Sequence, residues 1–241
     1  TGGSDYPAQA AVAADADSYF TFAGHLETPE PFAGPQGVAV ASDGTVYVID
    51  AVNDRIQVFD ASGAFRETWG ELGDGDGQFS FHEEGGRYGG DIAFGSDGTI
   101  YVAESNNGRI QTFAPDGTHI ATWPIASENG TVPSFLTGIA LDENAGRIYV
   151  ADWNSNKLLV LDMNGAELDE WGADGAAAEW SLFQATDVAV AADGTVIMTD
   201  LGRDRLQFFT PDGELTASWG GKGVDPGRFD GLVSVALDAE G

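Results

Sequence analysis

The 241-residue sequence has no cysteine, two methionines, and ten basic side chains against 39 acidic ones. The absence of cysteine excludes a thiol nucleophile and leaves the redox compartment open. Ten cations cannot build the positively charged surface that phosphate groups require, so nucleic acid is disfavoured as a partner. No apolar run approaches the ~20 residues of a membrane-spanning helix, and we expect no such segment.

The negative charge is extreme and is spread over the whole chain. The formal net charge is -29, and Lys157 and Lys222 are the only lysines. Molar salt screens the self-repulsion of such a chain to a distance of ~3 Å. We therefore expect a halophilic protein whose acidic surface is adapted to high salt. The simpler alternative is an acidic surface that only maintains solubility.

The first 17 residues differ from the rest of the chain. Residues 1–17 are small, polar and acidic, which is typical of a flexible lead-in. This opening resembles the tether of a secreted lipoprotein, which implies an extracellular or cell-surface location and membrane contact only through an upstream lipid anchor. Asn129 begins an Asn-x-Thr sequon and is a candidate glycosylation site in such a protein.

From residue 18 onward, one pattern of short strands returns four times. Each unit has a small apolar strand, a glycine turn, a strand that ends in an acid, a polar turn, a strand that begins with a cation, and a strand that ends in tryptophan. Four antiparallel strands joined by hairpins form one blade of a β-propeller. The tryptophan and the cation of the unit each recur at intervals of 54, 48 and 48 residues. The tryptophans are Trp69, Trp123, Trp171 and Trp219, and the cations are Arg55, Arg109, Lys157 and Arg205.

These units resemble NHL repeats. The resemblance is carried by the GVAV strand at 37–40, by Thr45–Phe59 with its Val-Tyr-Val and Arg-Ile-Gln-Val-Phe strands, and by the connectors Gly73–Phe79 and Asp225–Phe229. It implies an all-β propeller with five or six blades in a complete ring. NHL proteins include lyases, RNA-binding modules and cell-surface scaffolds, so the resemblance specifies the fold and hardly constrains the function.

We expect the propeller to occupy residues 18–241, with one blade incomplete. The complete blade units are expected at 35–70, 89–123, 136–171 and 184–219, and the partial blade combines 18–24 with 231–238. By comparison with the other repeats, that blade lacks two strands, or about 20 residues. Either the natural chain continues past Gly241, or another chain fills the gap. The second alternative would make the partial blade a site for a protein partner or for self-assembly.

The acid that ends the second strand of each unit is a candidate metal ligand. A ring of four carboxylates could bind Ca²⁺, the one cofactor that the sequence suggests. The alternative, which its recurrence in every blade favours, is that each acid accepts backbone N–H groups in its own turn. By the same logic, each recurring cation is expected to pair with a nearby acid. The four candidates are Asp50, Glu104, Asp152 and Asp200.

Departures from the repeat are better candidates for a ligand site. The first period is six residues longer than the others, and the extra length falls in the connector 79–91. This connector gathers ionisable side chains between glycine pairs, and an aspartate replaces the small residue that opens the inner strand in two blades. The alternative is a solvated surface insertion. The ligand-binding candidates are His82, Glu83, Arg87, Tyr88, Asp91 and Asp187.

No catalytic residue is assigned from the sequence. The amidating-lyase branch of the NHL family uses several histidines around a metal, whereas this chain has only His25, His82 and His119. His119 opens an outer strand on the opposite side, so a three-histidine zinc site is not expected. We therefore predict an extracellular binding or structural propeller that mediates protein–protein or surface assembly in high salt. The alternative is a metal-assisted lyase or lactonase-like hydrolase with its site at the channel mouth.

Overall fold

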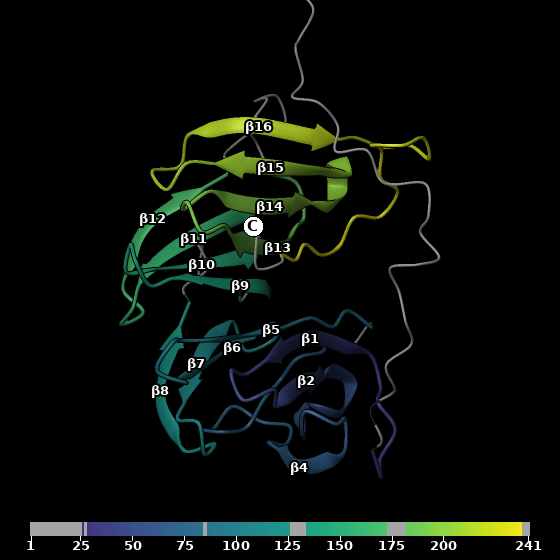
Figure 1. Cartoon of the computed structure of the whole chain (residues 1–241), viewed down its shortest axis with the longest axis vertical. Coiled ribbons are helices and arrows are strands. Elements are labelled where there is room, and N and C mark those ends of the chain that lie inside the picture. Colours follow the sequence, from purple (N-terminus) through teal and green to yellow (C-terminus); the bar gives the residue numbers. More distant parts are fainter. Residues whose placement is uncertain (1–25, 27, 84–85, 126–133, 173–181, 238–241) are drawn as a thin grey trace, which may run out of the picture.

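The computed structural model describes residues 26, 28–83, 86–125, 134–172 and 182–237. Its strands form four antiparallel sheets of four strands, each made of strands that follow one another along the chain (Figure 1). These sheets are the blades of a β-propeller, so the predicted fold class is confirmed. Within the described ranges, no helix has the length and apolar character needed to cross a bilayer.

The sixteen strands are numbered along the chain, and the first strand of each blade is the innermost. Blade 1 contains β1 (Pro35–Val40), β2 (Val46–Asp50), β3 (Arg55–Phe59) and β4 (Phe65–Trp69). Blade 2 contains β5 (Asp91–Phe94), β6 (Ile100–Glu104), β7 (Arg109–Phe113) and β8 (His119–Pro124). Blade 3 contains β9 (Leu136–Asp142), β10 (Arg147–Asp152), β11 (Lys157–Asp162) and β12 (Glu167–Trp171). Blade 4 contains β13 (Ala185–Val190), β14 (Val196–Asp200), β15 (Arg205–Phe209) and β16 (Leu215–Gly220).

The strand alternation explains why the blades pack face to face. Side chains of a strand point alternately to its two faces, so a strand that is apolar throughout can bury both. In β2, Tyr47 and Ile49 pack in the core between blades 1 and 2, whereas Val48 lies on the other face. Similar apolar cores lie between blades 2 and 3 and between blades 3 and 4. The inner strands β1, β5, β9 and β13 contact one another in that order.

Three of the four recurring tryptophans, Trp69, Trp123 and Trp171, pack between described blades as predicted, whereas Trp219 is exposed. Trp69 lies 6.3 Å from Phe113 of the next blade between ring centroids. Its indole also covers Gly117, where an added Cβ would lie 3.1 Å from the ring. Gly117 has φ +81 in its turn, a conformation that glycine adopts without strain. Trp171 is likewise only 7% exposed against blade 4.

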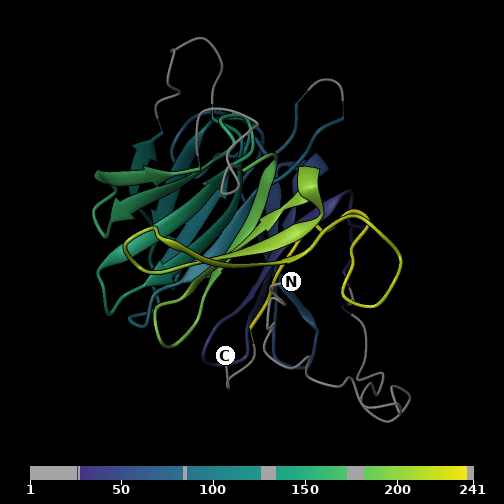
Figure 2. The same ribbon diagram turned by 90° about the horizontal axis from the view of Figure 1, so that it is seen from above.

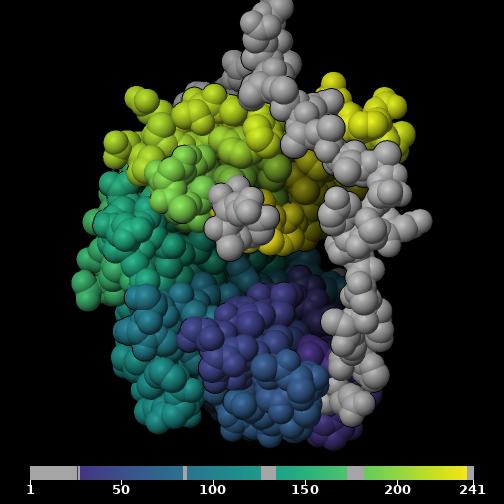
Figure 3. All heavy atoms as spheres, viewed as in Figure 1, coloured from purple at the N-terminus to yellow at the C-terminus, as the bar shows by residue number. Residues whose placement is uncertain are grey.

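Blades 1 and 4 each have one face that no other described blade covers. Val38 on β1 is 61% exposed, and Val40 is 62% exposed. The residues that occupy the position of Val38 in the other three blades are each 4% exposed: Ile92, Ile139 and Val188. On blade 4, Trp219 is 48% exposed. Blade 1 (purple to blue) and blade 4 (green to yellow) lie below and above the middle of the molecule in Figure 3.

The segment 231–237 lies where the inner strand of a further blade would lie. It runs back from the rim toward the middle of the molecule (yellow in Figures 1 and 2). Gly231 N–H donates to Asp204 Oδ1 at 2.6 Å, and Thr199 Oγ1 donates to the carbonyl of Val233 at 3.3 Å. The predicted lead-in 1–17, the strand at 18–24, His25 and Asn129 lie outside the described residues.

Candidate functional site

The acid at the end of the second strand has the same structural role in every blade. All four side chains are 0–2% exposed. Each carboxylate accepts a backbone N–H from the connector that enters its own blade, at 2.6 to 3.2 Å. The acid therefore ties the entering chain to the second strand. The donor–acceptor pairs are Ala33 and Asp50, Ser80 and Glu104, Phe135 and Asp152, and Phe183 and Asp200.

In three blades the same carboxylate is also bound by an arginine and a glutamine. In blade 2, Arg109 Nε and Gln111 Nε2 each donate to Glu104 Oε1 at 2.7 Å. Burial raises the pKa of Glu104, although its bonds to Arg109, Asn107 and Gln111 act in the opposite direction. Blade 3 differs because Lys157 pairs with Glu170 at 2.9 Å. The equivalent partners are Arg55 and Gln57 in blade 1, and Arg205 and Gln207 in blade 4.

The carboxylate ring proposed for Ca²⁺ is not formed among the described residues. Each of the four acids is used by donors of its own blade, which leaves few lone pairs for a cation. In the part of the chain that the structure describes, no group of three or more His, Asp or Glu side chains could hold a metal ion. The hydrogen bonds are those of the alternative interpretation, in which these acids order their own turns.

The connector 79–91 contacts blade 1 near its start and blade 3 near its end. Phe81 N–H donates to Asp54 Oδ1 at 2.8 Å, and His82 Nδ1 lies 2.9 Å from Asp54 Oδ2. Tyr88, which is 43% exposed, lies against Gly34 of blade 1, where an added Cβ would be 3.3 Å from its ring. The connector therefore follows the surface of blade 1 before it enters blade 2.

Arg87 makes the contact with blade 3. Its guanidinium lies 4.6 Å from the ring centroid of Phe135 and 4.5 Å from that of Trp153, within the range of a cation–π interaction. It also forms an ion pair with Glu83 and donates to Asn154 Oδ1 at 3.1 Å. The sequence analysis missed Trp153 and Asn154. The sequence did contain one indication of this contact, because Trp153 follows the turn acid at a position where the other blades have smaller or aliphatic residues.

The remaining two candidates, Asp91 and Asp187, lie on inner strands and contact the inner strand of the following blade. Asp91 Oδ2 accepts the N–H of Ile139 on β9 at 3.0 Å. Asp187 Oδ2 accepts the N–H of Val235 at 2.9 Å and the hydroxyl of Ser234 at 2.6 Å. In both cases donor and acceptor are 48 residues apart. One contact is thus repeated in alternate blades.

Glycine on the neighbouring inner strand makes room for each aspartate. A Cβ at Gly37 would lie 2.7 Å from the Cα of Asp91, and a Cβ at Gly138 would lie 2.7 Å from the Cα of Asp187. Such distances are too short for any side chain at these positions. At this position, successive inner strands therefore alternate between glycine and aspartate: Gly37, Asp91, Gly138 and Asp187. Sequence reasoning found the aspartates and missed the glycines.

The electrostatics of this pair are unlike those of the turn acids. Burial raises the pKa of Asp91 to about 8, and the nearby charge of Asp187 acts in the same direction. Burial also raises the pKa of Asp187, although its bonds to Ser234 and Val235 oppose the shift. Two like charges in a poorly hydrated place disfavour double ionisation. Raised pKa values of this kind are frequent at functional sites.

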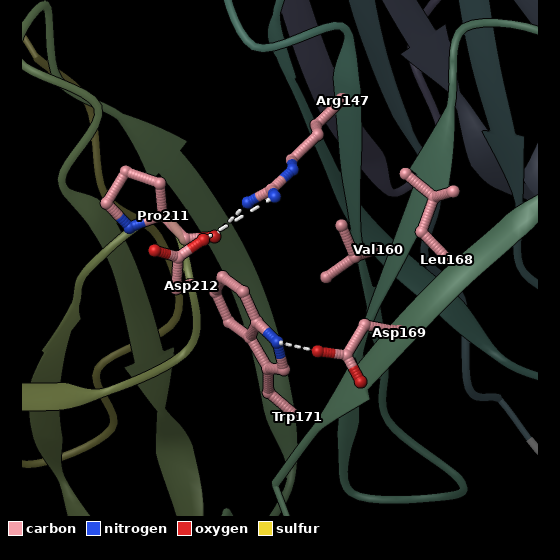
Figure 4. A pocket seen from close by; sticks show the side chains of 7 residues that line it. All are labelled: Arg147, Val160, Leu168, Asp169, Trp171, Pro211 and Asp212. Carbon is pink, nitrogen blue, oxygen red and sulfur yellow. Dashed lines mark hydrogen bonds and ion pairs between the residues drawn. The ribbon is translucent and has the colours of Figure 1, made fainter.

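A separate groove of about 170 Å³ lies at the rim between blades 3 and 4 (Figure 4). Arg147 contacts the carbonyl of Pro211 and lies 3.6 Å from Asp212, and Trp171 Nε1 donates to Asp169 at 3.0 Å. The polar groups of the groove are thus bonded to one another. Val160 and Leu168 complete its lining.

Comparison with known families agrees with this geometry. The NHL repeat family matches residues 32–59 and 90–113. Blades 1 and 2 therefore contain the segments that match the NHL repeat. Both matches include the inner strand, the second strand with its terminal acid, and the arginine that binds that acid. Blade 4 has the same set of partners around Asp200 and lies outside the two matches.

Two characterised proteins are similar in sequence. Protein brain tumor of Drosophila melanogaster is 30% identical over 143 residues, which is 58% of this chain and 12% of that protein. Protein SUPPRESSOR OF QUENCHING 1, chloroplastic, of Arabidopsis thaliana is 28% identical over 163 residues, which is 58% of this chain and 15% of that protein. The chain therefore spans less than one sixth of the length of either relative.

Solved structures share the fold. A streptogramin B lyase structure superposes with a TM-score of 0.61 at 18% identity, covering 80% of this chain and 57% of the lyase. At this identity the likeness concerns the propeller architecture. The propeller described here thus resembles a little over half of that lyase in its fold.

Proposed function

We propose that this NHL-repeat propeller binds protein through its two uncovered blade faces and the segment 231–237. The observation that carries the proposal is the contrast at one register position. Val38 is 61% exposed, whereas Ile92, Ile139 and Val188 are each 4% exposed. Trp219 shows the same contrast on blade 4, since it is 48% exposed and Trp171 is 7% exposed. Large apolar residues left uncovered at matched positions favour a protein contact.

Main-chain pairing would add to this apolar contact. Segment 231–237 is extended and occupies the place of an inner strand, and a partner strand could pair with its outward edge by β-augmentation. Two copies of a chain of net charge -29 repel each other at low salt. Self-assembly would therefore require molar salt, whereas a basic partner would bind best at low salt.

Sedimentation velocity over a range of protein concentrations in molar KCl tests self-assembly. We expect a concentration-dependent dimer or larger species, which Val38→Glu and Trp219→Glu abolish because each buries a charge in the interface. Val224→Glu is the control, since Val224 is 91% exposed in the connector after β16. A chain that remains monomeric at every concentration and salt would contradict self-assembly. Equal loss in the control would contradict the proposed faces.

We also propose an extracellular or cell-surface location in a high-salt habitat. The support is the net charge of -29, the near absence of lysine and the small polar lead-in 1–17. In molar KCl the acidic surface is screened, and its self-repulsion returns on dilution. We expect the melting temperature, followed by circular dichroism, to fall steeply when KCl is diluted to tens of millimolar. A melting temperature that does not depend on KCl would remove this proposal.

The second candidate function is a lyase or lactonase-like hydrolase at the channel mouth. The observation that favours it is the pair Asp91 and Asp187, because one neutral and one ionised carboxyl can serve as acid and base. The fold likeness to a streptogramin B lyase structure suggests streptogramin B as a substrate to try. Lactone opening, followed by mass spectrometry with and without added divalent metal, should be lost in Asp91→Asn. No turnover under either condition would remove this candidate.

A further inference from the structure

Two carboxylates flank one short backbone segment at the centre of the ring. Asp91 on β5 bonds to the N–H of Ile139 from one side, at 3.0 Å. Asp187 on β13 lies against the preceding residue, Gly138, from the other side, where even a Cβ would be 2.7 Å from the Cα of Asp187. The missing side chain at Gly138 is what allows the three inner strands to approach this closely.

No cation on the surrounding strands compensates the pair. The inner strands β1, β5, β9 and β13, the paired strands β6 and β14, and segment 231–237 contain no lysine, arginine or histidine. Besides the pair, the titratable groups on these elements are Tyr101 and Glu104 on β6, Asp142 at the far end of β9, and Asp200 on β14. Glu104 and Asp200 are bound by Arg109 and Arg205. Strand β10, which pairs with β9, contains Arg147 at its far end, opposite Asp142, where it lies 3.6 Å from Asp212.

The hydrogen bonds distinguish the two carboxyls. Asp187 receives three donors, which are the Ser234 hydroxyl at 2.6 Å, the Val235 N–H at 2.9 Å and its neighbour Val188 N–H at 2.8 Å. Asp91 receives the N–H of Ile139 and a weaker contribution from Ile92. Donors favour the ionised form of a carboxyl, so Asp187 is the better carboxylate of the two.

We propose that Asp91 and Asp187 share one proton across Gly138, held on Asp91, and that loss of this proton loosens the ring. With the proton in place, Asp187 carries the single negative charge and holds segment 231–237 on blade 4. When Asp91 ionises, two negative charges oppose each other across Gly138 on the inner strand of blade 3. The inference does not depend on the proposed binding function, because it concerns the chain alone.

The direction of the pH effect follows from linkage. The pKa of Asp91 is raised to about 8 from its ordinary 3.8, so the folded chain binds a proton more tightly than the unfolded chain. Neutral Asp91 stabilises the folded chain fully below pH 3.8, the ordinary pKa of the group. This stabilisation is lost as the pH rises toward about 8, the pKa of Asp91 in the folded chain. The two carboxyls titrate together, so the observed midpoints belong to the pair.

Asp91→Asn tests the proposal because an amide resembles the protonated acid and its oxygen can still accept the N–H of Ile139. In molar KCl, the melting temperature of the unaltered chain should fall between about pH 5 and about pH 9. The Asp91→Asn variant should show a clearly smaller fall and a higher melting temperature than the unaltered chain at the alkaline end. Glu214→Gln, at an exposed turn, is the control and should keep the original slope. An unchanged slope in Asp91→Asn would overturn the proposal.

A second measurement needs no variant of Asp91. In a carbon-detected NMR titration, one aspartate carboxyl of the unaltered chain should titrate with a midpoint near the value of about 8 given above for Asp91. Asp187→Asn removes the opposing charge and should move this midpoint downward. If every aspartate carboxyl titrates in its ordinary range, no shared proton exists and the proposal fails.

Discussion

Blade 2 contains one fully buried acid and one partly buried acid, and their surroundings differ sharply. Glu104 at the end of β6 is bound by Arg109 and Gln111, each at 2.7 Å. Asp91, at the start of β5, has no cation on the described inner strands around it, and the charge of Asp187 lies nearby. The first acid recurs in every blade, and in blades 1, 2 and 4 an arginine binds it. An aspartate at the position of Asp91 occurs in blades 2 and 4, and in both it lies against a glycine on the inner strand of the preceding blade. Glu104, which belongs to the repeat, is neutralised by Arg109 of the same repeat. Asp91 departs from the repeat, so its carboxyl must stay protonated or bind another partner.

The largest effect is expected from breaking the compensated acid. Glu104→Gln leaves Arg109 buried without its counter-charge, and removing one partner of a buried ion pair typically costs about 3–5 kcal/mol. Urea unfolding in molar KCl measures the loss of unfolding free energy. Glu214→Gln is again the control and should change it by less than about 0.5 kcal/mol. A loss below about 1 kcal/mol for Glu104→Gln would mean that the ion pair is not a main support of the turn.

A smaller effect is expected from crowding the uncompensated acids. Gly138→Ala adds a Cβ 2.7 Å from the Cα of Asp187, and the inner strands must separate to accept it. Overpacking of this kind typically costs about 1–3 kcal/mol of unfolding free energy. Gly37→Ala, which meets the Cα of Asp91 at the same distance, is the matched comparison. Thermal unfolding of both variants should show losses of similar size, and no loss in either would contradict the close approach of the inner strands.

The smallest effect is expected at the glutamine that supports the turn acid. Gln57 donates to Asp50 at 2.8 Å, whereas blade 3 has Leu159 at this position. Gln57→Leu makes blade 1 resemble blade 3 and should cost about 0.5–1.5 kcal/mol, the net value of one hydrogen bond. Gln36→Leu at an exposed site serves as control in the same denaturant titration. A cost above about 3 kcal/mol would show that blade 1 cannot use the arrangement of blade 3.

The architecture was predictable because its causes are local. The alternation of Tyr47, Ile49 and their neighbours predicts two-faced strands, and the glycine turns predict hairpins within a few residues. The connector 79–91 was also recognisable, since its extra length breaks a measured period. Its attachment to blade 3 was not predictable, because Arg87 and Trp153 are far apart in the sequence and neither carries a motif.

The carboxylate ring shows why residue spacing alone cannot establish a metal site. Asp50 and its equivalents have the right chemistry for Ca²⁺ and recur at a regular spacing, so the sequence permits a ring. Whether a carboxylate has free lone pairs depends on which donors reach it, and Ala33 N–H, Arg55 and Gln57 all bond to Asp50. Whether all the acceptor positions of a carboxylate are occupied depends on the folded turn and cannot be inferred from residue spacing.

The sequence by itself determined the blades, the turns, the order of the strands and the six candidate residues that depart from the repeat. These features rest on hydrogen bonds and side-chain alternation within about 15 residues of chain. Only the tertiary structure decided which acids are compensated and which are not. Asp91 and Ile139, and likewise Asp187 and Val235, are 48 residues apart and come within 3.0 Å of each other only when the blades close into a ring. The charge state of a buried carboxyl depends on those neighbours, because desolvation and nearby charge act over a few ångströms of space.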